Sequence, residues 1–222
     1  LTPPGAPGPV MKTLDQIEPR ILISSVPCVI TNSGAYYLAT SLVCTSGSVA
    51  ITVQADDVAI DMCGFALKGT NGSSMNGVQS SCNKLIIENG SVRDFGGIAI
   101  NGSGIGSIFR NLRISDCNGG FIVGTNALME NCTMNSLSSS WAPCIGIYCL
   151  SGCPSIRNCA IANVSSPASC IGIYSEGNVM VDHCTVDNLV SPSGSYGIYS
   201  TGGAVVTDCT VTRCTNGFYT AS

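Results

Sequence analysis

The chain repeats itself every 20 to 27 residues, and this periodicity constrains its fold more than any other feature. Each repeat begins with a glycine or alanine, followed by an apolar residue, a variable residue, and a small or apolar one. About a dozen residues later, most repeats carry a second apolar–polar alternation, such as IENGSV (87–92) or VDHCTV (181–186). The repeats begin at Ala50, Gly77, Gly97, Gly120, Gly146, Gly172, Gly197 and Gly217.

Within each repeat, the apolar–polar alternations are short and are separated by Gly, Asn and Ser. Strands this short and this closely spaced leave no room for helical crossovers, and no window sustains a helical period. A chain of this kind is best closed as a coil, in which each turn stacks on the previous one through parallel hydrogen bonds. The repeat therefore predicts an all-β solenoid of about seven coils.

Composition excludes several other classes. Charged residues make up 10% of the 222 residues, against about 25% in ordinary globular chains. The 45% hydrophobic content argues against disorder, and no apolar run is long enough for a membrane span. The net charge of −4, without a basic cluster, argues against a nucleic-acid partner. Fourteen cysteines predict an oxidising compartment, and a start at Leu1 fits a processed protein, so we expect a secreted or cell-surface location.

The segment LDQIEPRILISSVPCVITNSGAYYLATSLV (14–43), with ITVQADDVAIDMCGFALKG (51–69), resembles the entry module of right-handed parallel β-helix proteins of the pectin-lyase-like fold, of an uncharacterised bacterial secreted type. The resemblance implies a right-handed parallel β-helix. It leaves function open, because this fold hosts lyases, hydrolases, adhesins and structural rods. We expect a Pro/Gly-rich extended arm over 1–20 and one β-helix domain over 21–222, with an entry module at 21–49 and coils at 50–222.

Aligned repeats give columns of equivalent residues. Two apolar columns are expected to fill the core: Phe65, Val92, Ile114, Met134, Ile161, Val186 and Val211; and Ile98, Phe121, Ile147, Ile173, Ile198 and Phe218. An asparagine column is expected at a bend between strands, where Asn tolerates unusual backbone angles: Asn89, Asn111, Asn131 and Asn158, continued by His183 and Asp208. His183 is interpreted as a bend residue that replaces Asn.

Two groups of cysteines stand out among the fourteen. Cys132, Cys159, Cys184 and Cys209, with Cys63 as an equivalent, form a column interpreted as small buried hydrophobes. Zinc needs ligands that converge, and a straight column does not converge, so no metal site is expected. The other group offers disulfide candidates. Cys144 and Cys170 occupy the same place in adjacent repeats, Cys149 and Cys153 could close a small turn, and Cys28 could pair with Cys44.

A charged column runs along the repeats, and its signs alternate from Glu88 onward. Opposite charges one strand apart attract each other and help to fix the register. Catalysis would instead need two converging carboxylates with a raised pKa, so the chain is expected to lack a catalytic centre and a cofactor. Asp56 and Asp57 stand together but have no acidic partners in the next repeats. The charged column is Asp61, Glu88, Arg110, Glu130, Arg157 and Asp182.

Four tyrosines alternate with core residues and are therefore expected to face outward as an aromatic strip: Tyr148, Tyr174, Tyr199 and Tyr219, preceded in their column by Ala99 and Ile122. Exposed apolar strips commonly mark contact sites. Three interpretations stay open: Ser-rich turns with Trp141 as a lid cover the strip, another copy of the chain contacts it, or sugar rings pack on it.

The chain stops at GFYTAS, the first strand of an eighth coil, without a polar cap. Together with the Pro-rich arm, this favours a secreted structural protein whose copies stack end to end into a filament or surface layer. The alternatives are a polysaccharide-binding or polysaccharide-cleaving β-helix protein, or an adhesin domain.

Overall fold

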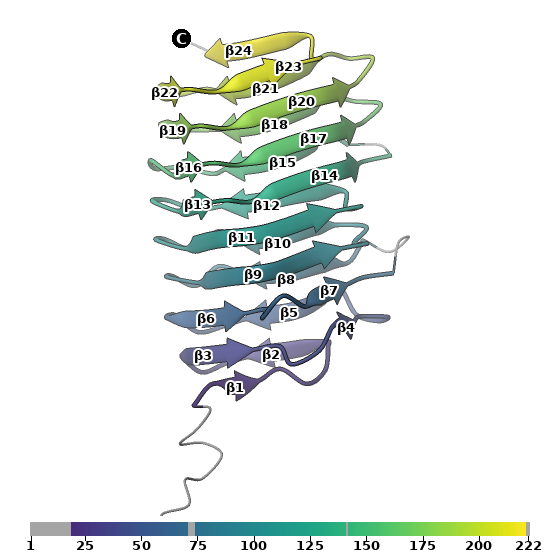
Figure 1. The fold of residues 1–222 in the computed structure, drawn as a ribbon, viewed down its shortest axis with the longest axis vertical. Helices are drawn as coiled ribbons and strands as arrows, with labels where there is room; N and C mark the ends of the chain where they lie inside the picture. The colour runs from purple at the N-terminus through teal and green to yellow at the C-terminus, as the bar shows by residue number, and fades with distance from the viewer. Residues whose placement is uncertain (1–18, 71–73, 141, 221–222) are drawn as a thin grey trace, which may run out of the picture.

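The computed structural model describes residues 19–70, 74–140 and 142–220. The described residues form strands and no helix, and the strands wind into an elongated parallel β-solenoid of about seven turns (Figure 1). This confirms the solenoid expected from the repeat. The described chain also holds no helix that could span a membrane. The expected arm over 1–20 lies almost entirely outside the described residues.

One side of the solenoid is a nine-stranded parallel sheet that runs its full described length. It receives one strand from each coil, and every strand after the first begins near the glycine or alanine that marks a repeat. In order, its strands are β2 (Cys28–Ile30), β5 (Val49–Val53), β8 (Asn76–Ser80), β10 (Ile98–Gly102), β12 (Gly119–Val123), β15 (Cys144–Cys149), β18 (Cys170–Ser175), β21 (Ser195–Ser200) and β24 (Asn216–Thr220).

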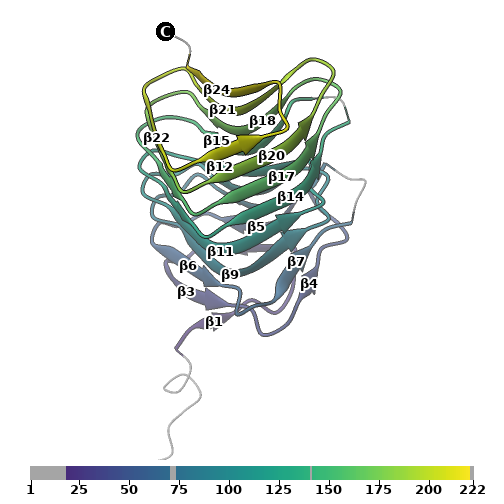
Figure 2. The same cartoon turned by 45° about the horizontal axis from the view of Figure 1, so that its top comes forward.

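The other side is a fifteen-stranded sheet that bends within each coil, so that its two arms and the nine-stranded sheet surround the core (Figure 2). β9 (Ile86–Arg93) and β11 (Ile108–Ser115) pass through the bend, whereas other coils use two strands. Before the bend lie β1 (Ile21–Leu22), β3 (Gly34–Tyr37), β6 (Val58–Asp61), β13 (Leu128–Glu130), β16 (Ser155–Arg157), β19 (Val179–Asp182) and β22 (Ala204–Thr207). After it lie β4 (Leu42–Val43), β7 (Ala66–Lys68), β14 (Thr133–Ser138), β17 (Ala160–Ser165), β20 (Thr185–Val190) and β23 (Thr210–Thr212).

Most of the two expected apolar columns lie in the core, which holds one continuous cluster of buried side chains. Two positions differ from the prediction. Leu67, rather than Phe65, pairs with Val92, because residues 62–65 fill a bend that only residues 89 and 90 fill in the next coil. Phe218 pairs with Ile198 as expected, yet it is 55% exposed, since no further described strand packs over β24.

The third repeat is also aligned differently from the prediction. Ile100 pairs with both Val78 and Phe121, so Ala99, and not Gly97, is equivalent to the glycines of the neighbouring coils. Asn101 therefore takes the column position that we assigned to Ala99, and Ile100 the position assigned to Ile98. A shift of two residues preserves the alternation of a strand, so the apolar pattern alone could not detect it.

Candidate functional site

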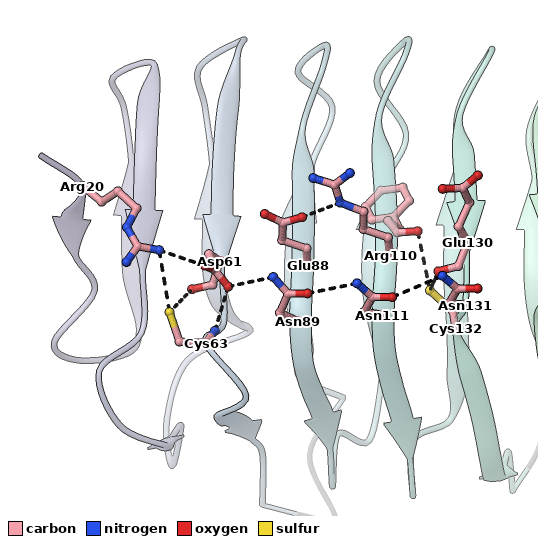
Figure 3. A network of polar contacts seen from close by, with 11 residues as sticks. Arg20, Asp61, Cys63, Glu88, Asn89, Arg110, Asn111, Glu130, Asn131 and Cys132 are labelled. Atoms are coloured by element: carbon pink, nitrogen blue, oxygen red, sulfur yellow. Dashed lines mark hydrogen bonds and ion pairs between the residues drawn. The ribbon is translucent and has the colours of Figure 1, made fainter. Parts of the chain in front are cut away.

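The asparagine column lies at the bend of the fifteen-stranded sheet, where each residue has a left-handed backbone. The φ angles run from 48° at Asp208 to 58° at Asn89. The side-chain amides of the first three members bond along the column: Asn111 Nδ2 donates to Asn89 Oδ1 at 3.0 Å, and Asn131 Nδ2 donates to Asn111 Oδ1 at 3.3 Å (Figure 3). Asn89 in turn donates to Asp61 at 3.2 Å. The column thus combines an unusual backbone angle with a ladder of amide bonds.

A second asparagine ladder runs beside the first and was missed by the sequence analysis. Asn163 Nδ2 donates to Asn135 Oδ1 and Asn188 Nδ2 donates to Asn163 Oδ1, both at 2.7 Å. Asn163 and Asn188 also have positive φ angles. The signal was available in the sequence, because both residues stand two positions after the inward Ile161 and Val186.

The charged column is in register throughout, from Asp61 to Asp182. Arg110 pairs with Glu88, as Figure 3 shows, and this contact raises the pKa of the guanidinium. The acidic pair outside this column is also engaged locally: Asp56 accepts a backbone hydrogen bond from Asn83 at 2.7 Å, and Asp57 lies 3.2 Å from Lys84 Nζ. Neither arrangement brings two carboxylates together as an acid–base pair.

The cysteine column lies just after the bend. Cys132, Cys159 and Cys184 are buried, and Cys209 is half-buried. Each thiol donates to the carbonyl oxygen two residues earlier, at 3.1–3.3 Å. The thiols therefore satisfy bend carbonyls as well as filling space. Cys63 does not belong to this column: it is exposed, and Met62 packs inward against Gly90 in its place.

All fourteen cysteines lie within the described residues, and all are free thiols. The expected Cys144–Cys170 bridge is not formed, because both residues lie in register within strands and not in adjustable turns. Their thiols donate to separate carbonyl groups, those of Asn118 and Val190. Burial raises the pKa of Cys144 to about 12.

The other two expected bridges are absent as well. Cys149 is buried within β15, whereas Cys153 is exposed beyond the strand. Cys44 donates its thiol to the carbonyl of Ser46 at 3.2 Å, and Cys28 is half-buried in β2.

The four tyrosines of the expected strip pair in register across β15, β18, β21 and β24. Successive ring centroids are 5.1, 5.3 and 5.0 Å apart. Tyr148, Tyr174 and Tyr199 are half-buried, and Tyr219 is 47% exposed. The Tyr148 hydroxyl bonds to Glu176, which raises its pKa to about 12. The rings therefore cover one another, and Tyr219 at the end of the strip is the most exposed of the four.

A second outward column lies beside the tyrosines. Ile145, Ile171 and Tyr196 are in register there, with Ile171 buried and the other two half-buried, and the Tyr196 ring stacks on Tyr199 with centroids 5.3 Å apart. This column was not expected from the sequence, because its residues precede the repeat glycine. We call the two columns together the tyrosine face: Ile122, Ile145, Tyr148, Ile171, Tyr174, Tyr196, Tyr199 and Tyr219. These residues carry no formal charge, and Glu176 adjoins them through its bond to Tyr148.

The Ser-rich turns stack on one another. Ser166 Oγ donates to the carbonyl of Ala142, and Ser191 Oγ donates to that of Ala168, at 2.7 and 2.8 Å. These hydrogen bonds join the turns of successive coils to one another. Trp141, expected as a lid, lies outside the described residues.

The fold and these columns define a parallel β-solenoid protein. Comparison with protein-family models, with curated proteins and with solved structures gives no match.

Proposed function

We propose that this chain is a non-catalytic structural protein whose solenoids self-associate through the tyrosine face. One observation carries the proposal: Ile122, Tyr148, Tyr174, Tyr199 and Tyr219 form one uncharged outward column, and the neighbouring column is apolar over three coils, at Ile145, Ile171 and Tyr196. Parallel sheets are normally covered on both faces, and contiguous apolar patches on a surface commonly mark interaction sites. A second copy of the same face would supply the missing cover.

The contact proposed here is lateral, whereas the sequence analysis favoured end-to-end stacking. The tyrosine face lies along the side of the rod, so copies would lie side by side in a layer or bundle. The extracellular location and the kinship with pectin-lyase-like secreted proteins remain part of the proposal through the sequence resemblance. The free thiols do not support an extracellular location.

Polysaccharide binding is the second candidate function, and the ring geometry favours it. Because the ring faces pack on one another, tyrosines spaced 5.0–5.3 Å apart along the rod would present one ring edge and one hydroxyl per coil to an extended sugar chain. An adhesin domain would use the same face.

Sedimentation velocity over a wide range of protein concentration tests the proposal. The wild-type protein should form larger species as the concentration rises, and Tyr174→Ser combined with Tyr199→Ser should remain monomeric. Gln79→Ser is the matched control, because Gln79 lies in the same outward column but outside the tyrosine face. Circular dichroism verifies that the variants fold.

The same samples separate the two functions when neutral and acidic oligosaccharides are added. A wild-type protein that stays monomeric and binds an oligosaccharide, with binding lost in the double variant, would replace self-association with glycan recognition. Association that is unchanged in the double variant would remove the tyrosine face from the account.

A further inference from the structure

The asparagine column changes chemistry near its C-terminal end, where His183 replaces asparagine and Asp208 follows in the next coil. Both residues have left-handed backbones, with φ angles of 50° and 48°, so they stand at the same bend in successive coils. Asp182 comes directly before His183 at the end of β19. The column thereby gathers one imidazole and two carboxylates at one place on the surface.

The distances within this group suit a shared cation. His183 Nε2 lies 3.7 Å from Asp208 Oδ2, and the opposite ring nitrogen, Nδ1, lies 2.9 Å from Asp182 Oδ1. A single ion can bind only one of these two nitrogens. One potential ligand atom from each of the three residues lies within 4.8 Å of the others. Two ligand atoms bound to one tetrahedral zinc ion at about 2.0–2.1 Å are about 3.4 Å apart, which is close to the His183–Asp208 separation.

The chemistry of the three side chains selects the class of ion. Imidazole nitrogen together with carboxylate oxygen suits zinc and its first-row neighbours better than calcium or magnesium, which prefer oxygen ligands alone. The His183 and Asp208 side chains are 58% and 73% exposed, so an ion can reach them and their rotamers can adjust. Arg157 pairs in register with Asp182 and reduces the attraction for a cation at that carboxylate.

We propose that Asp182, His183 and Asp208 bind a divalent transition-metal ion of the zinc class, with water completing its coordination. This site is independent of the tyrosine face, and its failure would leave the proposed self-association untouched. The sequence alone predicted no metal site, since it offers a single histidine. The additional ligands proposed here are aspartates, and the coil brings them beside that histidine.

Isothermal titration of the full chain with zinc chloride tests the site, after the exposed thiols of the native protein have been blocked with iodoacetamide. We expect one zinc ion per chain and at least about tenfold weaker binding in His183→Asn and in Asp208→Asn. Asparagine occupies the equivalent bend in four other coils, so His183→Asn should keep the fold. Asp187→Asn is the control. The Asp187 carboxylate is paired with Arg213 and lies outside the proposed site, so its loss should leave zinc binding unchanged.

Two further readouts separate metal binding from a purely structural role. Zinc should raise the unfolding midpoint of the wild-type protein and not that of His183→Asn. Cobalt should give a weak visible spectrum of nitrogen and oxygen ligation, without the intense near-ultraviolet band of thiolate ligation. Equal zinc affinity in the wild type and His183→Asn, a thiolate spectrum, or no measurable binding at millimolar zinc would each overturn the proposal.

Discussion

At the scale of single residues, the bend of each coil depends on side chains that accept a left-handed backbone. Asparagine tolerates this conformation because its short amide can bond locally, whereas most L-residues pay about 1–2 kcal/mol there. In this chain the same amide also bonds to the equivalent amide of the next coil. Asparagine at the bend therefore both accepts the left-handed backbone and links one coil to the next through its side-chain amide.

Asn111 allows these two contributions to be measured separately, since it both donates and accepts in the ladder. We expect Asn111→Ala to lower the free energy of unfolding by about 2 kcal/mol, because it loses the amide bonds and keeps a Cβ in a left-handed backbone. Asn111→Gly should cost about 1 kcal/mol, since glycine removes only the bonds. Chemical denaturation measures both, and an equal cost for the two variants would contradict a role for the backbone angle.

The cysteines show how a residue can be placed correctly while its role is missed. Burial of the column at Cys132, Cys159 and Cys184 follows from alternation, which the sequence displays directly. The bond from each thiol to the carbonyl two residues earlier depends on the bend geometry. No residue pattern reveals that geometry, so the sequence could indicate only a small apolar side chain.

At the scale of the element, the repeat predicted the strands, their parallel stacking and most inward positions. It failed where a coil gained residues in the bend, as at Cys63 and Gly64, and where a strand slid by two residues, as at Gly97. Both errors have the same cause. Alternation has a period of two, so it specifies which face a residue occupies and not which residue it pairs with.

The repeat glycines are explained by a close approach between the two sheets. A Cβ on Gly172 would lie 2.5 Å from Val186 Cγ1 and 2.5 Å from the carbonyl oxygen of Gly197. Gly217 holds the same place in the last described coil, where a Cβ would meet no atom within 4 Å. The two positions therefore differ in packing and share their place in the repeat.

Alanine substitution at these two glycines tests the packing of the coil. Gly172→Ala should lower the free energy of unfolding by about 1–3 kcal/mol through overpacking. Gly217→Ala should change it by no more than about 0.5 kcal/mol. The difference between the unfolding midpoints of the two variants in urea is the measurement, and similar losses at both positions would contradict the described interior.

At the scale of the whole molecule, the solenoid is held by stacked hydrogen bonds and a continuous core, and its fourteen thiols are free. The sequence suggested covalent staples because the cysteine count is high. Parallel in-register strands instead point neighbouring side chains the same way, which suits the torsion of a disulfide poorly. In this chain, the cysteines of the column fill the core and bond to the carbonyl groups of the bend.

Thiol counting directly measures how many cysteines are free. We expect fourteen reactive thiols per chain in denaturant without a reducing agent. In the native protein at mild pH, only a few thiols should react quickly, led by the exposed Cys153, because burial raises the pKa of Cys117 and Cys149 to about 12, and desolvation together with Asp61 raises the pKa of the exposed Cys63. A count of twelve or fewer in the denatured protein would show that at least one bridge forms.

The tyrosine face links the repeat to the proposed function, because stacking the coils turns one tyrosine per repeat into a continuous ladder of half-buried rings that ends at the exposed Tyr219. Electron microscopy of the concentrated wild-type protein examines that link most directly. The account predicts rods lying side by side in pairs or layers, with isolated rods in the Tyr174→Ser, Tyr199→Ser double variant. Isolated wild-type rods at every concentration, or rods joined only at their tips, would contradict it.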